Sequence, residues 1–152
     1  GWHLGNDRKW GKHSLFERAL KSALIIKLPG EKHYNPKIKA IVESVDLYPT
    51  LMDYCGIKPP YELDGESVLK LIQSKETDSE NLAFSFWKNG VSMRTDRYRL
   101  TQFYRAESPQ IELYDHTSDP SENNNIALSH KKIVDSLIPV LKQKTPQFYD
   151  TP

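Results

Sequence analysis

The hydrophobic pattern of this chain changes period near residue 82, and this change constrains the fold more than any other feature. Before it, apolar residues recur at helical spacing or in one short block. After it come four segments of strand-like composition, at residues 82–87, 91–94, 97–104 and 111–114. Asn89-Gly90 is a strong hairpin signal between the first two segments. The pattern therefore predicts a meander of four antiparallel strands.

A final amphipathic helix follows the predicted strands. Its interior Pro139 lacks a backbone donor, so we expect it to bend or split the helix. The apolar positions share one helical face: Ile133, Leu137, Val140 and Leu141. We therefore predict that residues 61–152 form a small α+β C-terminal subdomain, in which a four-stranded antiparallel sheet is packed by a helix.

The first sixty residues contain one short apolar block and one helical pattern. Residues 24–28 are almost continuously apolar, which predicts a strand buried on both faces of a sheet. A helix is predicted over residues 47–54, with Asp46 as its cap and Gly56 as its left-handed stop. Pro59-Pro60 interrupts the regular pattern. We therefore place the domain boundary between residues 1–60 and 61–152.

Composition excludes several classes of function. The chain has 21 Lys and Arg against 20 Asp and Glu, and the resulting net charge of +1 is too small to predict binding to nucleic acid. No apolar run approaches the roughly 20 residues of a membrane span. The single cysteine, Cys55, cannot form an internal disulfide, and no paired cysteines suggest a zinc site.

Arginine and aromatic residues alternate on the third predicted strand. Arg97 and Arg99 lie on one face and Tyr98 on the other, because side chains alternate along a strand. Stacking on nucleic acid would use such a pattern. A solvated face beside a packed face explains it equally well, and this is the interpretation we favour.

The first twelve residues combine glycines, two tryptophans and a run of cations, which is typical of a functional loop. A phosphate-binding P-loop is excluded, because five residues separate Gly5 from Gly11 where four are needed, and His13 stands where Ser or Thr would hold magnesium. Taken alone, Trp2 and Trp10 could be a core aromatic pair beside a surface amine. The wider sequence favours a functional role.

Five segments, in order along the chain, resemble the sulfatase family and particularly its iduronate-2-sulfatase-like branch. That branch carries an Asp-His-Gly-Trp/Tyr-x-Leu-Gly-Glu-His loop that runs on to Trp-x-Lys. The chain differs from it at Asn6-Asp7, where Glu-His is usual, so the resemblance does not identify the sugar or aryl group that is bound. The matching segments are Gly1-Trp2-His3-Leu4-Gly5 with Trp10-Gly11-Lys12-His13-Ser14-Leu15-Phe16-Glu17, then Ser44–Leu51, Leu63–Ser67, Ser92–Arg99, and Glu112–Asp115 with Asp119-Pro120.

The resemblance implies roles for three residues of the first segment. Lys12 aligns with the lysine that contacts the sulfate, and a cation there would stabilise the negative charge that builds as the S–O bond breaks. Trp2 and His3 would line the mouth of the pocket and contact the organic part of the substrate. The implied fold is the C-terminal part of an alkaline-phosphatase-like sulfatase, in which residues 1–60 would be the incomplete C-terminal end of the large α/β catalytic domain. The implied location is periplasmic, lysosomal or secreted.

The same resemblance implies that the chain is one portion of a larger hydrolase. The family's formylglycine nucleophile arises in a Cys/Ser-x-Pro-x-Arg motif that this chain lacks, and its calcium ligands would end just before Gly1, so we expect no metal ligand here. We expect the isolated chain to be inactive, to pair with the missing N-terminal portion, and to oligomerise through exposed apolar surface. Two alternatives remain: a phosphodiesterase or phosphonate monoester hydrolase of the same superfamily, and a non-catalytic binding or assembly module.

Overall fold

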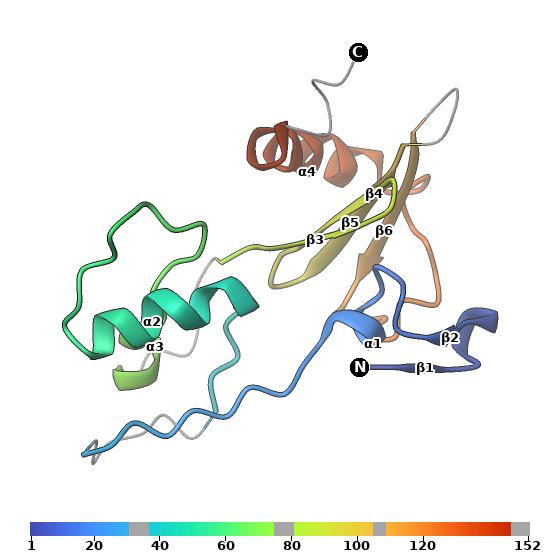
Figure 1. The fold of residues 1–152 in the computed structure, drawn as a ribbon. Helices are drawn as coiled ribbons and strands as arrows, with labels where there is room; N and C mark the ends of the chain where they lie inside the picture. Colours follow the sequence, from blue (N-terminus) through green and yellow to red (C-terminus); the bar gives the residue numbers. More distant parts are fainter. Residues whose placement is uncertain (31–36, 75–80, 105–108, 147–152) are drawn as a thin grey trace. The chain divides into compact units, whose positions relative to one another are not determined.

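The computed structural model describes residues 1–30, 37–74, 81–104 and 109–146 (Figure 1). Contacts within the chain form two units. Residues Gly1–Ser22 join Phe84–Pro152 in one unit, and Ala23–Ala83 form the other. This grouping arises because residues 1–22 bond to a sheet built later in the chain. The predicted boundary at residue 60 refers to domains of a larger enzyme, and it stays a prediction.

Four antiparallel strands form the centre of the first unit, as the change of period predicted. Their order in the sheet follows their order in the chain. The hairpin also forms, although its turn lies at Lys88-Asn89 and Gly90 is already part of the second strand. The main chains of Asn89 and Tyr104 are hydrogen-bonded at 2.8 Å, which extends the pairing to this turn. The strands are β3 (Ala83–Trp87), β4 (Gly90–Arg94), β5 (Tyr98–Phe103) and β6 (Gln110–Asp115).

The two faces of this sheet differ in character. Met93, Leu100 and Leu113 lie opposite one another in register and are fully buried on one face. Ser92 and Thr101 form a register pair on the other face and are buried among polar groups. Figure 1 shows α4 (Lys131–Lys144) on one side of the sheet. The N-terminal segment lies on the other side, and it includes β1 (His3–Leu4), β2 (Trp10–Gly11) and α1 (Glu17–Leu20). The apolar face therefore packs on the helix, and the polar face receives the N-terminal segment.

The final helix, α4 (Lys131–Lys144), forms as predicted. It buries Val134 and Leu141, and Pro139 does not split it into two helices. A proline at this position removes one hydrogen bond to the preceding turn, and the apolar face of the helix offsets that loss by packing. Of the helices in the described ranges, none is long and apolar enough to cross a membrane.

The second unit contains η2 (Ser44–Asp46), α2 (Leu47–Tyr54) and α3 (Leu69–Gln73). The predicted helix over 47–54 is confirmed, and Gly56 follows it with φ of 65°. The Asp46 carboxylate does not bond within α2. It accepts hydrogen bonds from the main-chain N–H groups of Glu43 at 2.7 Å and Glu66 at 3.0 Å. Asp46 thus holds the chain before and after the helix together.

The strand predicted over residues 24–28 does not form. Leu28 packs in a small apolar core with Val68 and Ile72, whereas Ile25 is 93% exposed. A strand needs a neighbouring strand to pair its N–H and C=O groups, and neither of the sheets in the described part of the chain includes these residues. The apolar block therefore lies outside both of these sheets.

Candidate functional site

The predicted functional loop folds as a small β-ribbon. Strand β1 (His3–Leu4) pairs antiparallel with β2 (Trp10–Gly11), and the 3₁₀ turn η1 (Asn6–Arg8) joins them. Gly5 and Gly11 have φ of 95° and 99°, a conformation that favours glycine. Lys12 follows β2 directly and is exposed. The ribbon therefore holds this lysine at the end of a short, defined hairpin.

Both tryptophans of the ribbon lie over glycines and face outward. A Cβ atom on Gly5 would lie 3.3 Å from the Trp10 ring, and one on Gly11 would lie 3.8 Å from the Trp2 ring. Trp2 is 57% exposed and Trp10 is 77% exposed. Thus they do not form a core aromatic pair in this chain. The predicted contact of Trp2 with a substrate stays a prediction.

His3 is placed differently, because its ring is buried. Its Nε2 lies 2.7 Å from the Ser14 hydroxyl, and the ring meets Phe16 edge-on at 6.0 Å between centroids. These contacts tie the two ends of the loop together. The predicted contact of His3 with a substrate stays a prediction, while its contacts in this chain support the loop.

The segment after Lys12 crosses the polar face of the sheet and touches one strand after another. His13 stacks on Trp87 of β3 with ring centroids 4.7 Å apart and planes at 4°. Leu15 is buried against Gly90 of β4, where a Cβ atom would lie only 2.8 Å from its Cδ1. Glu17 then begins α1 (Glu17–Leu20) and reaches β5. His13, Leu15 and Glu17 thus contact β3, β4 and β5 in turn.

Arg99 of β5 receives this segment in a buried cluster of charges. Its Nη2 donates to Glu17 Oε2 at 2.5 Å, its Nε to Glu122 Oε1 at 2.6 Å, and its Nη1 to Ser92 Oγ at 3.1 Å. Arg99 is 3% exposed. The solvated face predicted for this strand is therefore wrong at Arg99, because two carboxylates and a hydroxyl replace water around the guanidinium.

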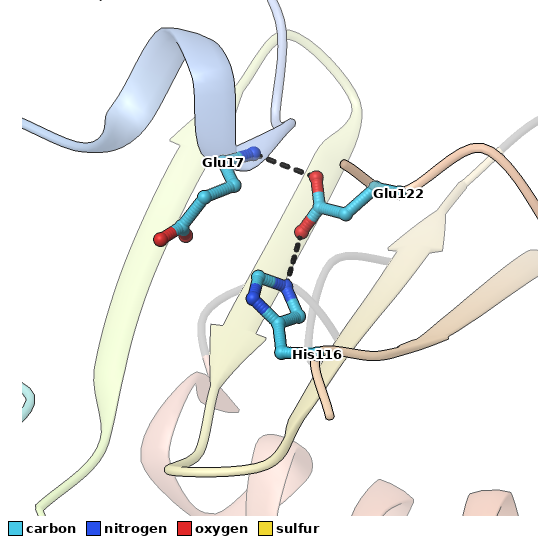
Figure 2. A group of neighbouring side chains, drawn as sticks. All are labelled: Glu17, His116 and Glu122. Carbon is cyan, nitrogen blue, oxygen red and sulfur yellow. Dashed lines mark hydrogen bonds and ion pairs between the residues drawn. The ribbon is translucent and has the colours of Figure 1, made fainter. Parts of the chain in front are cut away.

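Glu122 lies at the centre of the same cluster. Figure 2 shows the main-chain nitrogen of Glu17 directed at one oxygen of Glu122 and the ring of His116 at the other, at 2.6 Å and 2.7 Å. Burial raises the pKa of Glu122, but the hydrogen bond to His116, the charge of Arg99 and the Glu17 N–H together hold this pKa below its ordinary value. The carboxylate is therefore ionised at neutral pH.

This cluster does not fit a calcium ion. Glu17, His116 and Glu122 bring one potential ligand atom each within 4.8 Å of one another. However, both carboxylates already bind Arg99, whose positive charge opposes a second cation at the same place. A histidine nitrogen is also a poor ligand for calcium, which prefers oxygen. We call the set of Arg99, Glu17, Glu122 and His116 the ion-pair lock, because its members are held together by ion pairs and hydrogen bonds.

The second unit has an open hollow of about 550 Å³, lined by Pro49, Gly65 and residues 58–63. None of the predicted site residues Trp2, His3 and Lys12 lines it. The sequence analysis missed the ion-pair lock itself. The sequence carried one signal for it, which is that polar residues alternate along two neighbouring predicted strands. These residues include Ser92, Arg99 and Thr101, and the structure pairs Ser92 with Thr101.

Comparisons with known proteins agree with the resemblance. A family model for the C-terminal region of N-sulphoglucosamine sulphohydrolase matches residues 5–148. A sulfatase from Formosa agariphila is 32% identical over 148 residues, which cover 97% of this chain and 28% of the relative. An N-acetylglucosamine-6-O-sulfatase from Bacteroides thetaiotaomicron is 26% identical over 164 residues, which cover 99% and 29% respectively.

Solved structures agree as well. The structure of a 2-O GAG sulfatase matches 69% of this chain and 25% of its own length, with a TM-score of 0.58 and 28% identity. The chain spans somewhat more than a quarter of the length of the two curated relatives, 28% and 29%.

Proposed function

The chain belongs to the family of N-sulphoglucosamine sulphohydrolase C-terminal regions, and from this membership we propose that the protein hydrolyses sulfate esters, with Lys12 as a cation of its active site. The observation that carries the proposal is the family match over residues 5–148. The matched residues include the turn and the second strand of the ribbon, and Lys12 itself. The position of Lys12 supports it. This lysine is exposed, follows a hairpin fixed by two glycines, and precedes a segment bound to the sheet.

The proposed role of Lys12 follows from the chemistry of sulfate esters. As the S–O bond breaks, negative charge builds on the bridging oxygen. An ammonium group held in place beforehand stabilises that charge more in the transition state than in the substrate, and this difference lowers the barrier. Trp2 is proposed to contact the organic part of the substrate, because its ring lies beside Gly11 and is 57% exposed.

We further propose that the substrate is a sulfated carbohydrate. Support comes from the names of two relatives, one an N-acetylglucosamine-6-O-sulfatase and the other a 2-O GAG sulfatase. The proposed enzyme would use the formylglycine nucleophile and the calcium ion that the family resemblance implies. None of the residues 1–152 is proposed to hold either group, so these residues alone are expected to show no turnover.

The test measures hydrolysis by the full-length protein. The substrates are 4-nitrophenyl sulfate and N-acetylglucosamine 6-O-sulfate, with 4-nitrophenyl phenylphosphonate as the probe for the alternative superfamily activity. Lys12→Ala should lower kcat for the sulfate esters about 100-fold or more, the loss expected for one such donor. Arg18→Ala removes an exposed cation of the same segment and serves as the matched control.

Four other outcomes of the hydrolysis test would each contradict one part of the proposal. Wild-type turnover in Lys12→Ala would remove this lysine from the mechanism. Hydrolysis of the phosphonate alone would favour a phosphonate monoester hydrolase. Lack of turnover of any of the three esters would favour a binding or assembly module, and turnover by residues 1–152 alone would contradict the need for groups outside them.

A further inference from the structure

We propose that Arg99 and Glu122 are positioning residues for Lys12. They bind the segment that follows the lysine and thereby fix the main chain from which its ammonium group extends. The inference rests on the proposed function of Lys12, and it adds that the C-terminal sheet takes part in the reaction through this ion-pair lock. Neither residue is proposed to touch the substrate.

The first step of the argument is that the lock has a single well-defined geometry. Arg99 donates from Nε, Nη1 and Nη2 to three different side chains. Both oxygens of Glu122 are used, one by Arg99 and His116 and the other by the main-chain N–H of Glu17. Arg99 is planar and directional, so a displacement of Glu17 breaks several charge-assisted hydrogen bonds together.

The second step is that Glu17 is held by both its main chain and its side chain. Its N–H donates to Glu122 Oε2 at 2.6 Å, and its carboxylate accepts from Arg99 at 2.5 Å. Arg94 adds a third charge, with its Nε 3.6 Å from the same carboxylate oxygen. This residue is therefore a fixed point on the polar face of the sheet.

The third step connects Glu17 to Lys12 over five residues. Ser14 donates its N–H to the Lys12 carbonyl at 2.9 Å, and its hydroxyl accepts from the Phe16 N–H at 3.5 Å. The buried His3 holds that hydroxyl from the other side, at 2.7 Å. The main chain of Lys12 is thus linked to the lock by a continuous set of contacts.

A lock of this kind matters for catalysis because electrostatic stabilisation depends steeply on position. A misplacement of 1 Å by a change far from the reacting atoms can cost about 100-fold in rate. A smaller displacement of the ammonium group would leave substrate binding largely intact while lowering kcat. A purely structural ion pair would instead lower the amount of folded protein and leave kcat per folded molecule unchanged.

The test is a double-mutant cycle on kcat in the full-length protein, with 4-nitrophenyl sulfate and N-acetylglucosamine 6-O-sulfate as substrates. Glu122→Gln keeps the shape of the side chain but loses its charge and one acceptor oxygen. In the presence of Lys12 this change should lower kcat about 10-fold with KM within about 2-fold. In the Lys12→Ala background it should lower kcat less than about 2-fold, because the group that it positions is absent.

Asp115→Asn is the matched control. It also removes a carboxylate from an arginine on this sheet, since Asp115 accepts three side-chain hydrogen bonds from Arg97, and this pair is exposed and separate from the lock. Its kcat should equal that of the wild type. If Glu122→Gln fails to fold, as judged by circular dichroism and a thermal midpoint, the same cycle is run with Arg99→Lys, which keeps the charge and loses the planar fork.

The possible results separate the two proposals. Equal losses of kcat in both backgrounds, or wild-type kcat in a folded Glu122→Gln protein, would overturn the positioning role and leave the function of Lys12 intact. If Lys12→Ala alone retains wild-type kcat, the proposed function fails first and the positioning role falls with it. A loss seen only when Lys12 is present supports both.

Discussion

Replacing Arg99 by methionine should destabilise the chain by about 3–5 kcal/mol, the loss expected when one partner of a buried ion pair is removed. Methionine fills much of the same space but provides no charge and no donors. Glu122, which is 2% exposed, would lose the cation at 2.6 Å from its Oε1. Glu17 is partly exposed, so water can replace part of what its carboxylate loses. Most of the cost therefore comes from the buried Glu122.

The assay is urea unfolding of residues 1–152 at pH 7, followed by tryptophan fluorescence. The midpoint should fall while the slope of free energy against urea stays unchanged. Adding Glu122→Gln to Arg99→Met should recover part of the loss, because the uncompensated charge is then gone. The reasoning would be refuted by a loss below about 1 kcal/mol, the range of surface pairs, or by a double variant that loses the sum of the two single changes.

Two further predictions follow from the same face of the sheet. Because the pKa of Glu122 is lowered in the folded state, the stability that its charge contributes is complete above the ordinary glutamate value of about 4.3 and is lost as the pH falls through the lowered value. The urea midpoint of the wild type, measured at pH 7, 5 and 3, should fall at the acidic end, and Glu122→Gln should reduce this fall. An equal fall of the midpoint with pH in both proteins would contradict the prediction. Gly90→Ala should cost about 1–3 kcal/mol, because its Cβ would lie 2.8 Å from both Leu15 and Phe103, and a wild-type urea midpoint would show that Leu15 does not pack on β4.

Elements whose signals are local could be predicted from the sequence. The helix over 47–54 has its stop at Gly56, and the meander has alternating strands separated by a hairpin signal. The turn itself was displaced by one residue, to Lys88-Asn89. Glycine suits position 90 of β4 because Leu15 and Phe103 occupy the space that a side chain would take. That constraint comes from residues distant in sequence, and no local pattern reveals it.

Two other predictions failed because they depended on partners that local sequence does not show. The apolar block at 24–28 has the composition of a buried strand, but composition cannot say whether another strand lies beside it. Arg99 has the alternation of a solvated position, but Glu17 and Glu122, which bind it, lie 82 and 23 residues away. The position of Lys12 on a glycine-supported loop was predictable, whereas the lock that holds the loop was not.

The charges of the lock also explain how the N-terminal segment selects one register on the sheet. Leu15-Phe16 is apolar at both positions, so apolar packing alone discriminates weakly against a shift by one residue. Such a shift would move Glu17 away from Arg99 and leave buried charges without partners. An ion pair at the end of the segment therefore specifies the register, and through the register it specifies the place of the lysine.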